Sequence, residues 1–139
     1  MTPDTSAAPT SKRVNLVGSL TTAALLVLMT LSGALYLASP EPLLRALEPL
    51  GYPPYFLRLL GVAKLLGVAA LLVPGRPLLK EWAYAGFTFD LLAALASHLA
   101  TGTATHAPPA LLALLLVLAS YRFGHRGGAP MELFRRVAR

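Results

Sequence analysis

Four long runs of apolar residues dominate the chain, and short segments rich in proline, glycine and charge separate them. The runs cover residues 14–38, 55–73, 82–100 and 107–123. An apolar helix of about 20 residues spans a hydrocarbon core of about 30 Å, since each residue adds about 1.5 Å. The pattern therefore predicts an all-α fold, an integral membrane four-helix bundle.

Proline and glycine mark the expected ends of these helices. Residues 53–54 and 108–109 are proline pairs at the beginnings of the second and fourth runs, where proline interrupts no helical hydrogen bond. The second run ends at residues 74–77, Pro-Gly-Arg-Pro, which favour a tight turn. The second and third spans are therefore expected to form a helical hairpin.

The segments outside the runs have different characters. Residues 1–13 lack periodicity and predict a disordered tail, while residues 124–139 form a basic tail that either rests in the membrane interface or is solvated. In the first loop, Leu43, Leu47 and Leu50 fall on one helical face and predict a short interfacial helix. A cleaved signal peptide is the competing interpretation of the first run, although its apolar core would be only about 7–15 residues long.

Composition supports lipid as the surrounding solvent, because 55% of the 139 residues are hydrophobic and only 13% are charged. The net charge of +6 is concentrated at the ends of the runs, which favours anionic lipid and not nucleic acid as the counter-charge. There is no cysteine, which excludes thiol redox chemistry and thiolate metal sites within this chain. Any redox role needs a partner or a borrowed cofactor.

The basic residues also predict orientation. They precede the first run, lie between the second and third, and follow the fourth, whereas the loop at residues 101–107 has none. The positive-inside rule then places both termini in the cytoplasm. The residues on the expected cytoplasmic side are Lys12, Arg13, Arg76, Lys80, Arg122, Arg126, Arg135, Arg136 and Arg139.

Two ionisable residues lie in the middle of the second and third runs. Lys64 is nine residues before the end of its run and Asp90 eight residues after the start of the next, so the hairpin brings them to nearly one depth. A lone charge there costs about 2.5–3.5 kcal/mol, so we expect the two to form an ion pair. The pair either fixes the packing of two helices or forms a functional site. His98 lies about two helical turns beyond Asp90 on the same face and extends a conceivable proton path.

Other polar residues are weaker candidates. Glu81, Tyr84 and Thr88 can line one polar stripe, although Thr88 can instead bond to its own helix. The histidines are separated along the chain, so no metal or two-histidine haem site is expected. Trp82, Tyr52, Tyr55 and Tyr121 are expected to anchor the chain at the two membrane interfaces.

Several phrases resemble the DoxX-like family of small bacterial membrane proteins. They are GYPPY at residues 51–55, AKLLG at 63–67, LKEWAYAGF at 79–87 and the SH ending at 97–98. The resemblance covers residues 15–123 and implies a four-helix bundle in the bacterial inner membrane. The family is named after a membrane subunit associated with thiosulfate:quinone oxidoreductase, and Lys64, Glu81, Trp82, Asp90 and His98 match its polar pattern.

We therefore expect an accessory or anchoring subunit of a quinone-linked redox system that is not catalytic alone. In this interpretation Lys64, Asp90 and Tyr84 line a quinone pocket. The alternative is a small proton- or anion-coupled transporter that uses the Lys64–Asp90 pair, and a third is a bundle that only stabilises a neighbour. Small residues such as Ala63 and Gly67 at close-packing spacing are compatible with a homo-oligomer.

Overall fold

A computed structural model describes residues 9–124, and all regular structure in that range is helical. The expected all-α class is therefore confirmed for this part of the chain. The elements, in order, are α1 (Pro9–Ala38), α2 (Glu41–Leu47), the 3-10 helix η1 (Glu48–Leu50), α3 (Pro54–Leu72), α4 (Pro77–Ala100), the 3-10 helix η2 (Ala104–His106) and α5 (Pro108–Gly124).

The helix limits follow the proline and glycine positions, with two extensions beyond the expected spans. α1 begins at Pro9, so residues 9–13 of the expected tail are helical. α4 begins at Pro77 and not at residue 82, because the first turn of a helix accommodates a proline without losing a hydrogen bond. Between α3 and α4, Gly75 has a φ of +70°, a left-handed conformation that suits glycine in a tight turn. Residues 1–8 and 125–139 lie outside the described range, and with them almost all of the expected basic tail.

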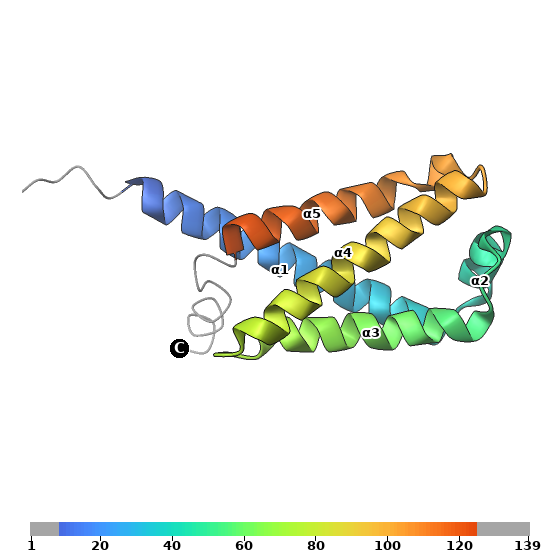
Figure 1. The fold of residues 1–139 in the computed structure, drawn as a ribbon, viewed down its shortest axis with the longest axis horizontal. Helices are drawn as coiled ribbons and strands as arrows, with labels where there is room; N and C mark the ends of the chain where they lie inside the picture. The colour runs from blue at the N-terminus through green and yellow to red at the C-terminus, as the bar shows by residue number, and fades with distance from the viewer. Residues whose placement is uncertain (1–8, 125–139) are drawn as a thin grey trace, which may run out of the picture.

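The four long helices run along the long axis of the molecule, and each is antiparallel to the long helix before it in the chain (Figure 1). α1 packs against α3 and α5, and α4 packs against the same two helices. One end of the molecule, which we call the turn end, carries the α3–α4 turn, the start of α1 and the end of α5 (Figure 1). The opposite end, the α2 end, carries α2, η1 and η2. The expected short helix in the first loop is thus present as α2.

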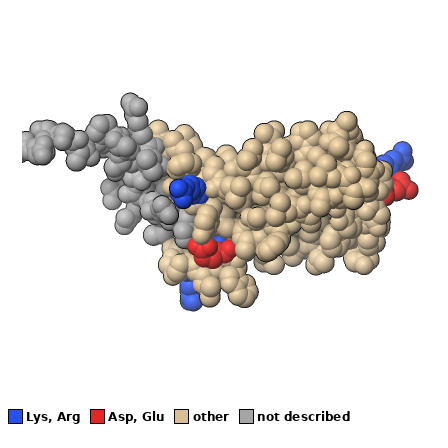
Figure 2. Space-filling view, turned by 45° about the horizontal axis from the view of Figure 1, so that its top comes forward, with Lys and Arg blue, Asp and Glu red and all other residues tan. Residues whose placement is uncertain are grey.

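Three of the long helices are sufficiently long and apolar to cross a membrane. These segments are Leu16–Ala38, Pro54–Leu72 and Pro77–Ala100, while α5 is apolar but has 17 residues. Large hydrophobic side chains are exposed along all four helices. Figure 2 shows charged side chains at the two ends of one face and a broad band without charge between them. A surface of this kind is stable in contact with lipid acyl chains.

Small and hydroxyl-bearing residues allow the helices to approach closely. A Cβ built at Gly61 of α3 would lie 2.8 Å from the Gly33 carbonyl oxygen of α1, so the two backbones are nearly in contact. Near the turn end, the buried Ser120 hydroxyl lies 2.9 Å from both the Thr22 hydroxyl and the Tyr84 hydroxyl. This network joins α1, α4 and α5 and fixes how they pack.

Candidate functional site

The centre of the candidate site is an ion pair between α3 and α4. Lys64 Nζ donates a hydrogen bond to Asp90 Oδ2, so the ion pair expected from the sequence is present. Lys64 is 5% exposed, and the Asp90 side chain is 16% exposed. Each charge is costly in a low-dielectric setting, and the partner offsets part of that cost.

A tyrosine from α1 completes the surroundings of the lysine. Lys64 Nζ lies 5.3 Å from the centre of the Tyr36 ring, a distance at which the ring face attracts a cation. No sequence pattern indicated this contact, because Tyr36 lies near the end of α1 whereas Lys64 lies in the middle of α3. α1 therefore contributes to the site, although only α3 and α4 were expected to form it.

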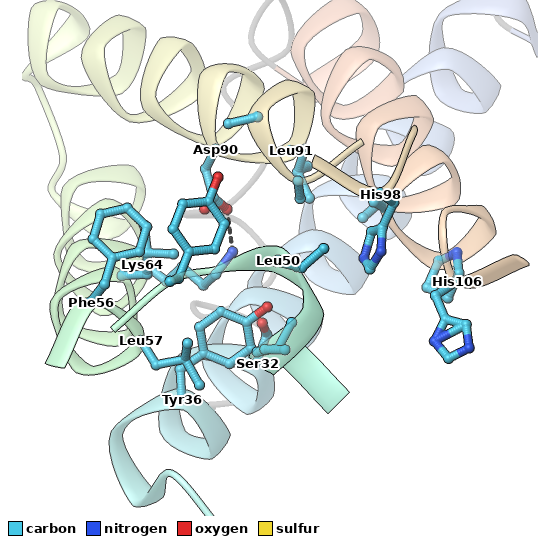
Figure 3. A pocket seen from close by; sticks show the side chains of 18 of the residues that line it. Ser32, Tyr36, Leu50, Phe56, Leu57, Lys64, Asp90, Leu91, His98 and His106 are labelled. Atoms are coloured by element: carbon cyan, nitrogen blue, oxygen red, sulfur yellow. Dashed lines mark hydrogen bonds and ion pairs between the residues drawn. The ribbon is translucent and has the colours of Figure 1, made fainter. Parts of the chain in front are cut away.

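The ion pair borders a cavity of about 290 Å³ among the four long helices, which we call the internal cavity. Its lining is mainly apolar and includes Met29, Leu57 and Leu91. Leu47 of α2 and Leu50 of η1 also line it and cover part of it at the α2 end (Figure 3). The polar residues that line it are Ser32, Tyr36, Tyr52, Lys64, Asp90, His98 and His106. A concave apolar site with a few convergent polar groups is typical of small-molecule binding.

The α2 end of the internal cavity carries two histidines. His98 Nδ1 lies 3.0 Å from the Thr103 hydroxyl, and the His98 and His106 rings are 6.2 Å apart between centres (Figure 3). Because the histidines are separated along the chain, this proximity was not expected; the short η2 helix folds back toward the end of α4 and brings His106 close to His98. Within residues 9–124 no cluster of three or more His, Cys, Asp or Glu residues is arranged to hold a metal ion.

The expected polar stripe on α4 lies away from the internal cavity. Tyr84 bonds to Ser120, the Thr88 hydroxyl donates to the Tyr84 carbonyl oxygen at 2.8 Å, and Glu81 accepts a hydrogen bond from the Tyr121 hydroxyl at 3.1 Å. None of Glu81, Tyr84 and Thr88 lines the cavity. Of the polar residues expected on α4, the structure brings only Asp90 and His98 to it.

The aromatic residues predicted as anchors lie at both ends of the molecule. Tyr55, near the start of α3, and Trp82, near the start of α4, are 70% and 72% exposed. Tyr121 lies near the end of α5, where its ring packs edge-on against Tyr84 with centres 5.3 Å apart. Tyr52 has a further role, because its hydroxyl lies 2.6 Å from the Ser97 hydroxyl of α4 and its side chain lines the internal cavity.

A second hollow, the lateral groove, lies between α3 and α4 and has a volume of about 410 Å³. Small residues contribute much of its lining, among them Ala63, Gly67, Ala83 and Gly86. The groove and the internal cavity have three lining residues in common, which are Leu60, Lys64 and Asp90. The ion pair therefore lies at the boundary between the two hollows.

The fold and the site together define a small helical membrane protein with a polar pair beside an apolar cavity. Residues 20–120 match the DoxX-like family, and because this is more than half of the chain, the protein belongs to that family. This confirms the resemblance seen in the sequence. No curated protein and no solved structure matches the chain.

Proposed function

We propose that this protein is a quinone-binding accessory subunit of a redox system in the bacterial inner membrane. The observation that carries the proposal is the Lys64–Asp90 pair at the edge of an apolar cavity inside the helices. Membership of the DoxX-like family supports a membrane location, and the quinone link rests on the resemblance together with the chemistry of the cavity.

The proposal includes four membrane crossings with both termini in the cytoplasm. α5 has 17 residues, which meets the lower limit of about 17–25 for a spanning helix. The α2 end balances Arg45 and Arg58 with Glu41 and Glu48. The turn end has more basic than acidic residues, since Arg76, Lys80 and Arg122 accompany Glu81. This difference supports a cytoplasmic turn end.

The donor set of the cavity fits a quinone head group. The Lys64 ammonium has three N–H donors, and Asp90 accepts from it, so further hydrogens can bond to a quinone carbonyl oxygen. Asp90 can accept a hydrogen bond from the hydroxyl of the reduced form. The apolar residues Leu57 and Leu91 would cover the faces of the ring, which suits a small conjugated head group.

A bound quinone would supply two-electron redox chemistry, and the chain would hold and orient it. Lys64 and Asp90 fix the polar edge of the head group, and the surrounding leucines exclude water. His98 lines the same cavity nearer the α2 end, where it can exchange protons with the aqueous side. Electrons must reach the site from a partner protein, which makes the chain an accessory subunit.

The proposal is tested by removing both charges together. In the Lys64→Met, Asp90→Asn double variant neither partner is left as an uncompensated buried charge. Native membranes carrying the double variant should show reduced quinone-linked electron flow at unchanged protein abundance. A matched control is Arg45→Met, which removes a cation from the exposed Arg45–Glu41 pair and lines neither hollow. Electron flow equal to that of the wild type in the double variant would refute the proposal.

The second candidate is a proton- or anion-coupled transporter, favoured by one observation. Because Lys64 and Asp90 border both the internal cavity and the lateral groove, rearrangement of the pair could expose it to each hollow in turn. The purified protein in sealed vesicles would then move protons or an anion without any partner. A redox subunit would show no flux in this assay, so the two functions are separable.

A further inference from the structure

The two hollows beside the ion pair differ in the polarity of their borders. At the α2 end, the internal cavity is bordered by the polar side chains of His98, His106 and Tyr52. The lateral groove is lined by apolar residues apart from Lys64 and Asp90, and it includes the highly exposed Leu66 and Trp82. Both of these side chains lie on the surface of helices that can span a membrane. The groove is thus the apolar route from the ion pair to the surrounding lipid.

Small side chains keep the lateral groove open. A Cβ built at Gly86, an exposed residue of the groove lining, would have no atom within 4 Å, so the groove is open to the surface beside this residue. At Gly67, on the facing helix α3, there is no room for a side chain, because a Cβ there would lie 2.6 Å from the Phe87 ring. Phe87 therefore packs against Gly67 and forms one wall of the groove, while Gly86 borders its empty part.

We propose that the lateral groove holds the hydrocarbon tail of the same ligand whose polar head group lies against Lys64 and Asp90 in the internal cavity. The inference rests on the proposed function for the identity of the head group, and it specifies the ligand as a tailed, lipid-soluble quinone. A cavity of about 290 Å³ holds a head group but not a long tail. The tail must therefore leave the site, and the shared lining of Leu60, Lys64 and Asp90 places the groove directly beside the head group.

The depth of the ion pair favours this occupant over a bulk phospholipid. A phospholipid keeps its charged head group at the membrane interface, whereas Lys64 and Asp90 lie in the middle of two membrane-spanning helices. A ligand held at that depth has a weakly polar head group and a tail that can pass directly between α3 and α4 into lipid. Membrane quinones have this construction.

Gly86→Leu provides a test that leaves the head-group contacts intact. The leucine side chain would occupy open space beside a residue that lines the groove, and replacing a glycine within a helix does not lower helix propensity. The matched control is Ala85→Leu, because Ala85 is the adjacent exposed residue of α4 and lines neither hollow. Both variants should purify with wild-type yield and thermal stability.

The measurement is equilibrium binding to the full-length protein in lipid nanodiscs, using one benzoquinone ring with an isoprenoid tail and the same ring without it. Gly86→Leu should weaken binding of the tailed quinone by about tenfold or more and leave the tailless one unchanged, while Ala85→Leu should alter neither. Equal effects of Gly86→Leu on both probes, or none on either, would overturn the groove assignment and leave the head-group site standing. If the wild type binds neither probe, the proposed function fails as well.

Two other occupants of the groove would give different results. If Gly86→Leu removes co-purifying phospholipid without altering binding of the tailed quinone, the groove holds a lipid acyl chain and the inference is wrong. If the substitution changes the native mass of the detergent-solubilised protein, the groove is a contact between two copies of this chain. That result would overturn the inference too.

Discussion

Removing Lys64 alone should destabilise the protein more than removing both members of the ion pair. In Lys64→Met, the Asp90 carboxyl group would remain among apolar residues without its ion-pair partner. Breaking a buried pair in this way costs about 3–5 kcal/mol. The Asp90 side chain also borders the internal cavity, where His98 and His106 line the α2 end, so water that enters from that end places the expected loss near the lower limit, about 3 kcal/mol.

The double variant Lys64→Met, Asp90→Asn should recover part of this loss, because a buried neutral amide without a partner costs about 1–3 kcal/mol, which is at most the cost of the broken ion pair. Unfolding of the purified proteins in mild detergent, followed by helical circular dichroism, measures the difference between the two variants. A single variant as stable as the wild type would show that the pair does not hold α3 and α4 together. A double variant less stable than the single one would refute the reasoning about an uncompensated charge.

Three further predictions concern packing around the site. Gly61→Ala should destabilise the protein by about 1–3 kcal/mol in detergent unfolding, because the new methyl group meets the Gly33 carbonyl oxygen. Wild-type stability would show that α1 and α3 can separate freely. Ser120→Ala should lower the free energy of unfolding by about 1–3 kcal/mol, since the buried Tyr84 hydroxyl loses its bond to Ser120. In a double-mutant cycle, the losses of stability from Ser120→Ala and Tyr84→Phe should sum to more than the loss in the combined variant. Tyr52→Phe should raise hydrogen exchange in α2 with little change in global stability, and unchanged exchange would show that the hydroxyl does not fasten the first loop to α4.

Much of the fold was predictable from periodicity and helix breakers. The proline and glycine positions set the ends of the helices to within a few residues, and the exceptions are the starts of α1 and α4. The Lys64–Asp90 contact was predicted correctly, but not because the spacing about the turn is equal: Lys64 lies eight residues before the end of α3, and Asp90 lies 13 residues after the start of α4. The contact follows from the cost of leaving either charge unpaired within two facing apolar helices.

The remainder of the site depends on packing between distant segments. Tyr36 reaches the lysine only because α1 lies against α3, and His106 approaches His98 only because of the conformation of residues 101–107. Tyr84 was expected to line the pocket together with Lys64 and Asp90. The Ser120 hydroxyl on α5 instead holds Tyr84 in a separate network. No spacing rule within one helix indicates which neighbour a polar side chain will meet.

The most direct test of the central claim is the quinone content of the protein purified from native membranes in mild detergent. Extraction followed by mass spectrometry should find near-stoichiometric quinone in the wild type and little in the Lys64→Met, Asp90→Asn variant, with redox subunits co-purifying with the wild type. Absence of quinone from both, or equal amounts in both, would contradict a head-group site at this ion pair.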